Sequence, residues 1–89
     1  WAARAPGGES ARAAQARAIR HIAALHERHS GQVVAIVTHA DIIRSVLAHL
    51  LGLPLQSWPR LSIDPGSVSR IAIDAQGAVV RSMNELPAA

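Results

Sequence analysis

The stretch Gln32-Val33-Val34-Ala35-Ile36-Val37-Thr38-His39-Ala40-Asp41 decides how the rest of the chain is interpreted. Its apolar run, 33–37, consists of Val, Ala and Ile and favours a β-strand that is buried on both faces. Asp41 then stands where a helix N-cap would, and apolar residues at helical spacing follow from Ile42 to Leu51. The pattern predicts a parallel strand, a short turn and a helix.

His39 lies at the predicted junction between strand and helix. Ligands of open α/β sheets bind at the carboxyl ends of the strands, and the free N–H groups at a helix N-terminus favour anions. His39 is therefore a candidate phosphate-binding residue. On spacing alone, a histidine that ends the strand and bonds a neighbouring carbonyl is an open alternative.

Four short motifs, in this order, resemble the histidine phosphatase (phosphoglycerate mutase-like) superfamily. They are Pro6-Gly7-Gly8-Glu9-Ser10, the run Val-Ala-Ile-Val-Thr-His-Ala-Asp-Ile-Ile-Arg at 34–44, Leu50-Leu51-Gly52-Leu53-Pro54-Leu55, and Pro65-Gly66-Ser67-Val68-Ser69. The family's Arg-His-Gly motif, which carries the nucleophilic histidine, is absent from the chain. The resemblance implies that residues 1–89 are the C-terminal half of such a domain, and the start at Trp1 suggests a fragment or a processed chain.

The resemblance also implies a fold and a function. The fold is α/β, part of a three-layer α/β/α phosphoglycerate mutase-like domain with a C-terminal antiparallel hairpin. The activity is phosphomonoester hydrolysis through a phosphohistidine, with phosphatase favoured over mutase and a phosphorylated small molecule as substrate. The nucleophilic histidine, its arginines and the usual acid would come from a missing N-terminal half or a partner chain.

Three residues take roles from this resemblance. His39 matches the second histidine, which donates a hydrogen bond to the phosphoryl oxygens, and the backbone N–H of Ala40 would be a second donor. The family commonly has Gly where Ala40 stands, so this departure bears on substrate shape. Glu9 is expected to support the phosphate-binding arginines, although a helix-terminal charge that complements the helix dipole is its structural alternative. No metal and no cofactor is expected, because histidine and arginine neutralise the phosphate.

Two further classes of function stay open. One is a non-catalytic half-domain that binds phosphate or a partner chain. The other is a basic nucleic-acid binder, since the formal charge is +3 with nine Arg and no Lys. The arginines are scattered singly, which disfavours nucleic acid. A metal site at His21, His26 and His29 is also disfavoured, because the spacing of His-Glu-Arg-His is one residue short of the zincin motif and no carboxylate ligand set accompanies it.

The remaining sequence predicts ordinary connecting elements. A helix is expected from Glu9 and Ser10 to about His29, and a second one from Asp41 to Leu51 that ends at Gly52. Short helical structure is expected at 56–60, a short strand at 61–63, and a β-hairpin over 68–84 with its turn at 75–77. The chain has no Cys and no apolar run of membrane-spanning length. We expect a cytoplasmic protein without a membrane segment.

Overall fold

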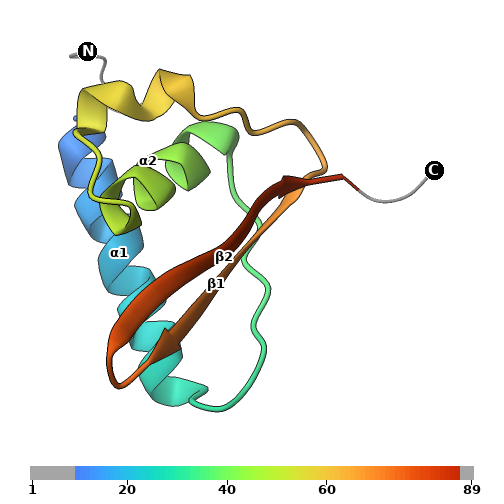
Figure 1. Ribbon diagram of the computed structural model, residues 1–89. Coiled ribbons are helices and arrows are strands. Elements are labelled where there is room, and N and C mark those ends of the chain that lie inside the picture. The colour runs from blue at the N-terminus through green and yellow to red at the C-terminus, as the bar shows by residue number, and fades with distance from the viewer. Residues whose placement is uncertain (1–9, 87–89) are drawn as a thin grey trace.

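The computed structural model describes residues 10–86. Its elements are the helices α1 (Ala11–Arg28) and α2 (Ala40–Leu50), the 3-10 helix η1 (Leu55–Arg60), and the strands β1 (Val68–Asp74) and β2 (Gly77–Glu85). The two α-helices pack against each other, and the hairpin of β1 and β2 extends beside them (Figure 1). None of the helices in this part of the chain has the length and apolar character that crossing a membrane requires.

Helix α1 forms as the sequence predicts. The Ser10 hydroxyl accepts a hydrogen bond from the Ala13 amide at 3.1 Å and so caps the N-terminus. At the other end the His29 amide donates to the Leu25 carbonyl at 2.9 Å. Alanines on the inner face bring α1 close to α2, and the Gln15 side chain donates to the Ser45 carbonyl at 2.7 Å across the contact. This hydrogen bond fixes how the two helices sit against each other.

Helix α2 carries most of the core. Its residues Val46, Leu47 and Ala48 are buried, and Leu47 is 2% exposed. The helix ends in a Schellman motif, in which the Gly52 amide donates to the His49 carbonyl at 3.2 Å and the Leu53 amide to the Ala48 carbonyl at 2.8 Å. The end at Gly52 therefore matches the sequence prediction.

The run 33–37 does not form the predicted parallel strand. It is an extended irregular segment that connects the end of α1 to the start of α2 (Figure 1), and within the described chain residues 33–38 take part in no backbone hydrogen bond. The side chains of Val33 and Val37 are 99% and 97% exposed. The prediction is wrong here for a physical reason: a strand exists through hydrogen bonds to a neighbouring strand, and residues 10–86 place none beside this run.

The C-terminal hairpin forms as predicted. Strands β1 and β2 pair antiparallel, with Ile71 opposite Val80 and Asp74 opposite Gly77. The Asp74 carboxylate accepts a hydrogen bond from the Gln76 amide at 2.8 Å and stabilises the two-residue loop. Burial alternates along β1, with Ile71 and Ile73 on the inner face.

The predicted short strand at 61–63 is absent. Ile63 is buried, at 5% exposure, but its segment is irregular. Its carbonyl groups are directed to a side chain instead of a strand, because Arg44 of α2 donates to the carbonyls of Leu61 and Ile63.

Candidate phosphate-binding site

His39 stands at the start of helix α2, as the candidate site requires. It is the N-cap, with φ −79° and ψ 152°, and its side chain makes no capping hydrogen bond. Asp41 was expected in that position, so the sequence placed the N-cap two residues too late. The reason is that the His39 carbonyl already accepts the first helical bonds, from the amides of Ile42 and Ile43, each at 3.1 Å. His39 is also solvent-exposed, so its imidazole is accessible to a ligand.

The first amides of α2 lie beside this imidazole. The bonds to the His39 carbonyl begin at Ile42, and within the described chain the amides of Ala40 and Asp41 donate to no backbone or side-chain acceptor. Free amides at the start of a helix carry a partial positive charge and favour anions. His39 and the Ala40 N–H thus lie at one helix terminus.

The Asp41 carboxylate in the same turn would repel an anion, and an ion pair with Arg44 reduces this repulsion. Asp41 is in the first turn of α2, and its side chain is 67% exposed. Arg44 donates to its carboxylate at 3.0 Å, the ion pair that the spacing of three residues predicts. The paired guanidinium reduces the repulsion that the Asp41 carboxylate would exert on a phosphate.

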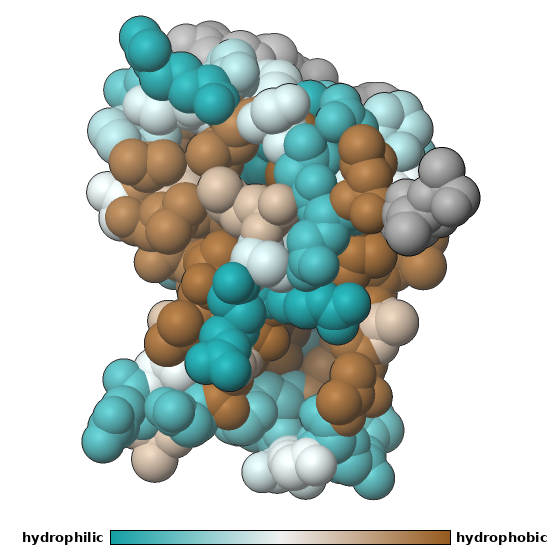
Figure 2. All heavy atoms as spheres, turned by 45° about the vertical axis from the view of Figure 1, so that its right-hand side comes forward, coloured by the Kyte–Doolittle hydropathy of each residue, from teal (hydrophilic) through white to brown (hydrophobic). Residues whose placement is uncertain are grey.

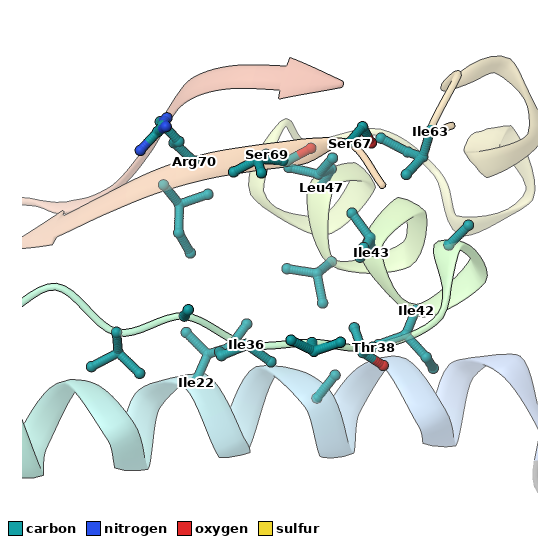
Figure 3. A pocket seen from close by; sticks show the side chains of 18 of the residues that line it. Ile22, Ile36, Thr38, Ile42, Ile43, Leu47, Ile63, Ser67, Ser69 and Arg70 are labelled. Atoms are coloured by element: carbon teal, nitrogen blue, oxygen red, sulfur yellow. The ribbon is translucent and has the colours of Figure 1, made fainter. Parts of the chain in front are cut away.

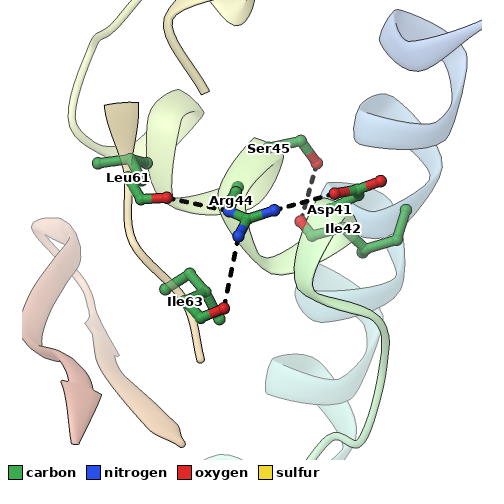
Figure 4. Close-up of polar contacts among 6 residues, drawn as sticks. All are labelled: Asp41, Ile42, Arg44, Ser45, Leu61 and Ile63. Atoms are coloured by element: carbon green, nitrogen blue, oxygen red, sulfur yellow. Dashed lines mark hydrogen bonds and ion pairs between the residues drawn. The ribbon is translucent and has the colours of Figure 1, made fainter. Parts of the chain in front are cut away.

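Arg44 does more than the sequence indicated. Its side chain is only 23% exposed, its Nε donates to the Leu61 carbonyl at 2.9 Å, and its guanidinium lies 5.3 Å from the centre of the Trp58 ring. A longer contact of 3.4 Å reaches the Ile63 carbonyl (Figure 4). Arg44 therefore holds the segment 61–63 against α2. Only the Asp41 contact had a local sequence signal, because the other partners are distant in the chain.

The segment after Ile63 is also fixed by side chains. The Asp64 amide donates to the side-chain oxygen of Asn84 at 2.8 Å, and the Asn84 side chain donates back to the Asp64 carboxylate at 3.1 Å. Asn84 has a positive φ of 55°, and its own amide donates to the Ser69 hydroxyl at 3.1 Å. This network ties the loop before β1 to the end of β2.

A large cavity adjoins the candidate site. It has a volume of about 970 Å³ and lies between α1 and the run 33–38 on one side and the start of β1 on the other (Figure 3). Thr38 and Ala40 line it, on either side of His39 in sequence, and the lining is mostly apolar. An apolar cavity is a poor place for a phosphate, which needs hydrogen-bond donors around it. We therefore treat the candidate anion site at His39 and this cavity as distinct features.

The remaining candidates from the sequence have different outcomes. Glu9 lies outside the described residues, so its approach to His39 stays a prediction. Among residues 10–86 no three His, Asp or Glu side chains come together as a metal site would need. His29 instead contacts the Gln32 side chain, with 3.0 Å between Nδ1 and Oε1.

Three comparisons with known proteins agree. The family model of the histidine phosphatase superfamily (branch 1) matches residues 1–86. The adenosylcobalamin/alpha-ribazole phosphatase of Escherichia coli (strain K12) is 31% identical over 77 residues, which are 86% of this chain and 38% of that protein. The solved structure of Bacillus stearothermophilus YhfR superposes with a TM-score of 0.85 at 25% identity, over 93% of this chain and 42% of its own.

The chain thus spans well under half of the length of both proteins that it matches. The mixed helix and strand architecture, with its antiparallel hairpin, corresponds to a phosphoglycerate mutase-like neighbour, as the resemblance implied. A match over 1–86 covers nearly the whole chain. The chain belongs to the histidine phosphatase superfamily, branch 1.

Proposed function

We propose that this chain supplies the second histidine and one wall of the phosphate pocket of a phosphomonoester hydrolase that works through a phosphohistidine. The observation that carries the proposal is the position of His39, an exposed imidazole without a capping hydrogen bond beside two free amides of α2. Membership in the superfamily supports the phosphohistidine route. The Escherichia coli relative is a phosphatase, which supports hydrolysis over mutase chemistry.

The proposed reaction has two steps. A histidine outside this chain attacks phosphorus, a P–N bond forms, the P–O ester bond breaks, and an acid outside the described residues protonates the departing alkoxide. Water then attacks the phosphohistidine, the P–N bond breaks, and inorganic phosphate leaves. In both steps negative charge spreads over the non-bridging oxygens. An N–H of the His39 ring and the Ala40 N–H would donate to those oxygens where the charge develops.

The isolated chain is expected to be inactive under this proposal. Phosphoryl transfer by this route needs a nucleophile, cations for the phosphoryl oxygens and an acid for the leaving group. The described residues offer one of these groups, the His39 donor, and Arg44 is occupied by carbonyls and Asp41. The other roles would belong to the N-terminal half or to a partner chain. Glu9 of this chain would support the phosphate-binding arginines.

A chimera tests the role of His39. In it, this chain replaces the segment of the Escherichia coli phosphatase that it matches, and the rest of that protein supplies the missing groups. We expect p-nitrophenyl phosphate turnover by the chimera, and a loss of about two to three orders of magnitude in kcat for His39→Ala, as for removal of one transition-state donor. His49→Ala, at an exposed histidine in the last turn of α2, is the matched control. Unchanged turnover in a folded His39→Ala chimera would refute the proposed role.

A non-catalytic half-domain is the second candidate, favoured by the exposed apolar run 33–37. Such a protein would bind a partner chain and inorganic phosphate without turnover. Phosphate titration of the chimera, followed by the NMR signals of the five His rings that this chain contributes, separates the two candidates. Phosphate-dependent shifts at His39 in a chimera that folds but has no turnover would favour the non-catalytic half-domain. A cytoplasmic location is part of the main proposal, and cell fractionation tests it.

A further inference from the structure

Asp41 is a charged residue beside the candidate anion site. It is the second residue of α2, and its amide is one of the two free N–H groups next to His39. The Cα–Cβ bonds of a helix tilt toward its N-terminus, so the Asp41 side chain leaves the backbone on the side of that site. The side chain is 67% exposed. A phosphomonoester held by His39 and the Ala40 N–H would therefore have a carboxylate next to it.

The ion pair with Arg44 compensates only one side of this carboxylate. The Arg44 guanidinium donates to Oδ1 of Asp41 at 3.0 Å, and within the described residues no donor is bonded to Oδ2. Arg44 also donates to the Leu61 carbonyl at 2.9 Å and is only 23% exposed, so its guanidinium lies on the inner side of the contact (Figure 4). The exposed Oδ2 is thus the anionic atom that a ligand at the start of α2 would meet.

The other surroundings offer mainly apolar surface. The wall of the adjoining cavity is mostly apolar, and Figure 2 shows apolar side chains at the surface on either side of a band of polar groups. Arg70, one of the cations that line the cavity, lies toward the end away from Thr38 and pairs with Glu85 at 2.9 Å (Figure 3). Apolar surface accepts an uncharged group but gives no counter-ion to a second anion. The further cations of the lining, none of which pairs with Asp41, are Arg17, His21 and Arg81.

We propose that Asp41 determines specificity in the proposed reaction. Its carboxylate favours phosphomonoesters whose alcohol part is uncharged or cationic, and it disfavours those that carry a carboxylate or a second phosphate there. The inference rests on the proposed function, because it takes the phosphoryl group to lie at His39. The donors at His39 and Ala40 would meet the charge of that group, whereas a second negative charge on the substrate would meet the Asp41 carboxylate.

Three phosphomonoesters of nearly equal size test this specificity in the chimera with the Escherichia coli phosphatase. They are phosphoethanolamine, which is cationic in its alcohol part, 2-hydroxyethyl phosphate, which is uncharged there, and 2-phosphoglycolate, which carries a carboxylate. The measured quantity is kcat/KM, from release of inorganic phosphate, relative to the value for 2-hydroxyethyl phosphate. The change caused by Asp41→Asn decides, because the rest of the pocket is the same in both proteins.

Asp41→Asn keeps the shape of the side chain and removes its charge. It should raise the relative kcat/KM for 2-phosphoglycolate by about two- to tenfold, the range for unit charges about 8 Å apart at effective dielectric constants between about 80 and 30. The relative value for phosphoethanolamine should fall by a similar factor. Asp74→Asn is the matched control, since Asp74 is exposed at the hairpin loop and does not line the cavity. It should change neither relative value.

A purely structural role of Asp41 predicts a different result. If the substitution acted only through the lost ion pair with Arg44, turnover of all three esters would fall alike. A uniform fall, unchanged relative values, or a change in the opposite direction would each overturn the proposal.

This failure can be distinguished from failure of the proposed function. Loss of turnover in His39→Ala together with unchanged relative values in Asp41→Asn would retain the role of His39 and reject that of Asp41. If the chimera folds but has no turnover, the NMR signals of His39 report the dissociation constants of the same three esters. The expected changes in their ratios are the same, and absence of binding by all three would overturn both proposals.

Discussion

At the scale of single residues, the contacts of a charged or polar side chain indicate whether it holds the fold together or can bind a ligand. Arg44 stands five residues after His39, where a cation could serve a phosphate. Its guanidinium instead contacts the carbonyls of Leu61 and Ile63, the Asp41 carboxylate and the Trp58 ring. His39 has the opposite character, since its side chain forms no cap hydrogen bond.

We predict that Arg44→Ala lowers the free energy of unfolding of the chain by about 2–3 kcal/mol, because hydrogen bonds from a charged group to partly buried carbonyls are lost. Arg70→Ala is the matched control. Arg70 is 63% exposed and pairs with Glu85 at 2.9 Å, so its loss should cost under about 1 kcal/mol. Urea denaturation of the three proteins measures both values. Equal costs would show that the Arg44 contacts to 61–63 contribute little.

At the scale of elements, local chemistry determined what the sequence could predict. Helix α1, the end of α2 and the hairpin follow from caps, glycines and alternation that lie within a few residues of each other. The predictions of strands at 33–37 and 61–63 are wrong because the structure of these segments depends on distant partners. The run 33–37 lacks a neighbouring strand, and the segment 61–63 is bonded to the Arg44 side chain. The candidate site follows the same division. The strand-to-helix pattern singled out His39 as a candidate and the family resemblance added Ala40, whereas the contacts of Arg44 to 61–63 had no local signal.

The end of α2 gives a test of its glycine. Gly52 has a φ of +74° in the Schellman motif, a region that costs a residue with a side chain about 1–2 kcal/mol. We predict that Gly52→Ala lowers the free energy of unfolding by about that amount. Gly52→Asn should cost less, because Asn tolerates this conformation better. If the two variants were equally stable, the backbone at 52 would not be the source of the loss.

The hairpin gives a prediction for pH. Hydrogen bonds from Ser82 and then from Arg70 lower the pKa of Glu85 below its ordinary value of 4.5. A carboxyl group whose pKa is lower in the folded state stabilises above the unfolded pKa and loses that contribution as the pH falls through the folded value. The difference in melting temperature between the chain and Glu85→Gln should therefore be present at neutral pH and shrink below pH 4.5.

Ser82→Ala is the companion variant for this measurement. It removes the largest cause of the lowered pKa of Glu85. In the Ser82→Ala background, Glu85→Gln should change the melting temperature at neutral pH by less than it does in the unaltered chain. A difference between chain and Glu85→Gln that stays constant far into the acid range would mean that the carboxyl group ionises alike in both states.

At the scale of the whole molecule, the buried core and the exposed apolar run lie in different segments of the chain. The core that holds α1, α2 and the segment 61–63 together consists of the buried apolar residues Ala14, Val46, Leu47, Ala48 and Ile63. The run 33–37 is as apolar as that core but contributes almost nothing to it, because it faces the cavity and solvent. In a chain that spans 38% of its Escherichia coli relative, this run is expected to gain its packing only when the rest of the domain is present.

The cost of one substitution should therefore depend on the context. In the isolated chain, Val37→Ala is expected to leave the free energy of unfolding unchanged within about 0.5 kcal/mol, since a side chain that is 97% exposed has no contacts to lose. Leu47→Ala, at a side chain that is 2% exposed, should cost about 2–5 kcal/mol and can unfold so small a core. In the chimera with the Escherichia coli phosphatase, Val37→Ala should become costly, by about 1–2.5 kcal/mol, because completing the sheet would bury that side chain. Urea denaturation of both backgrounds measures the change. A Val37→Ala cost that is equally small in both would mean that the run 33–37 stays at the surface of the complete domain, and the interpretation of the run as an interior strand would have to be given up.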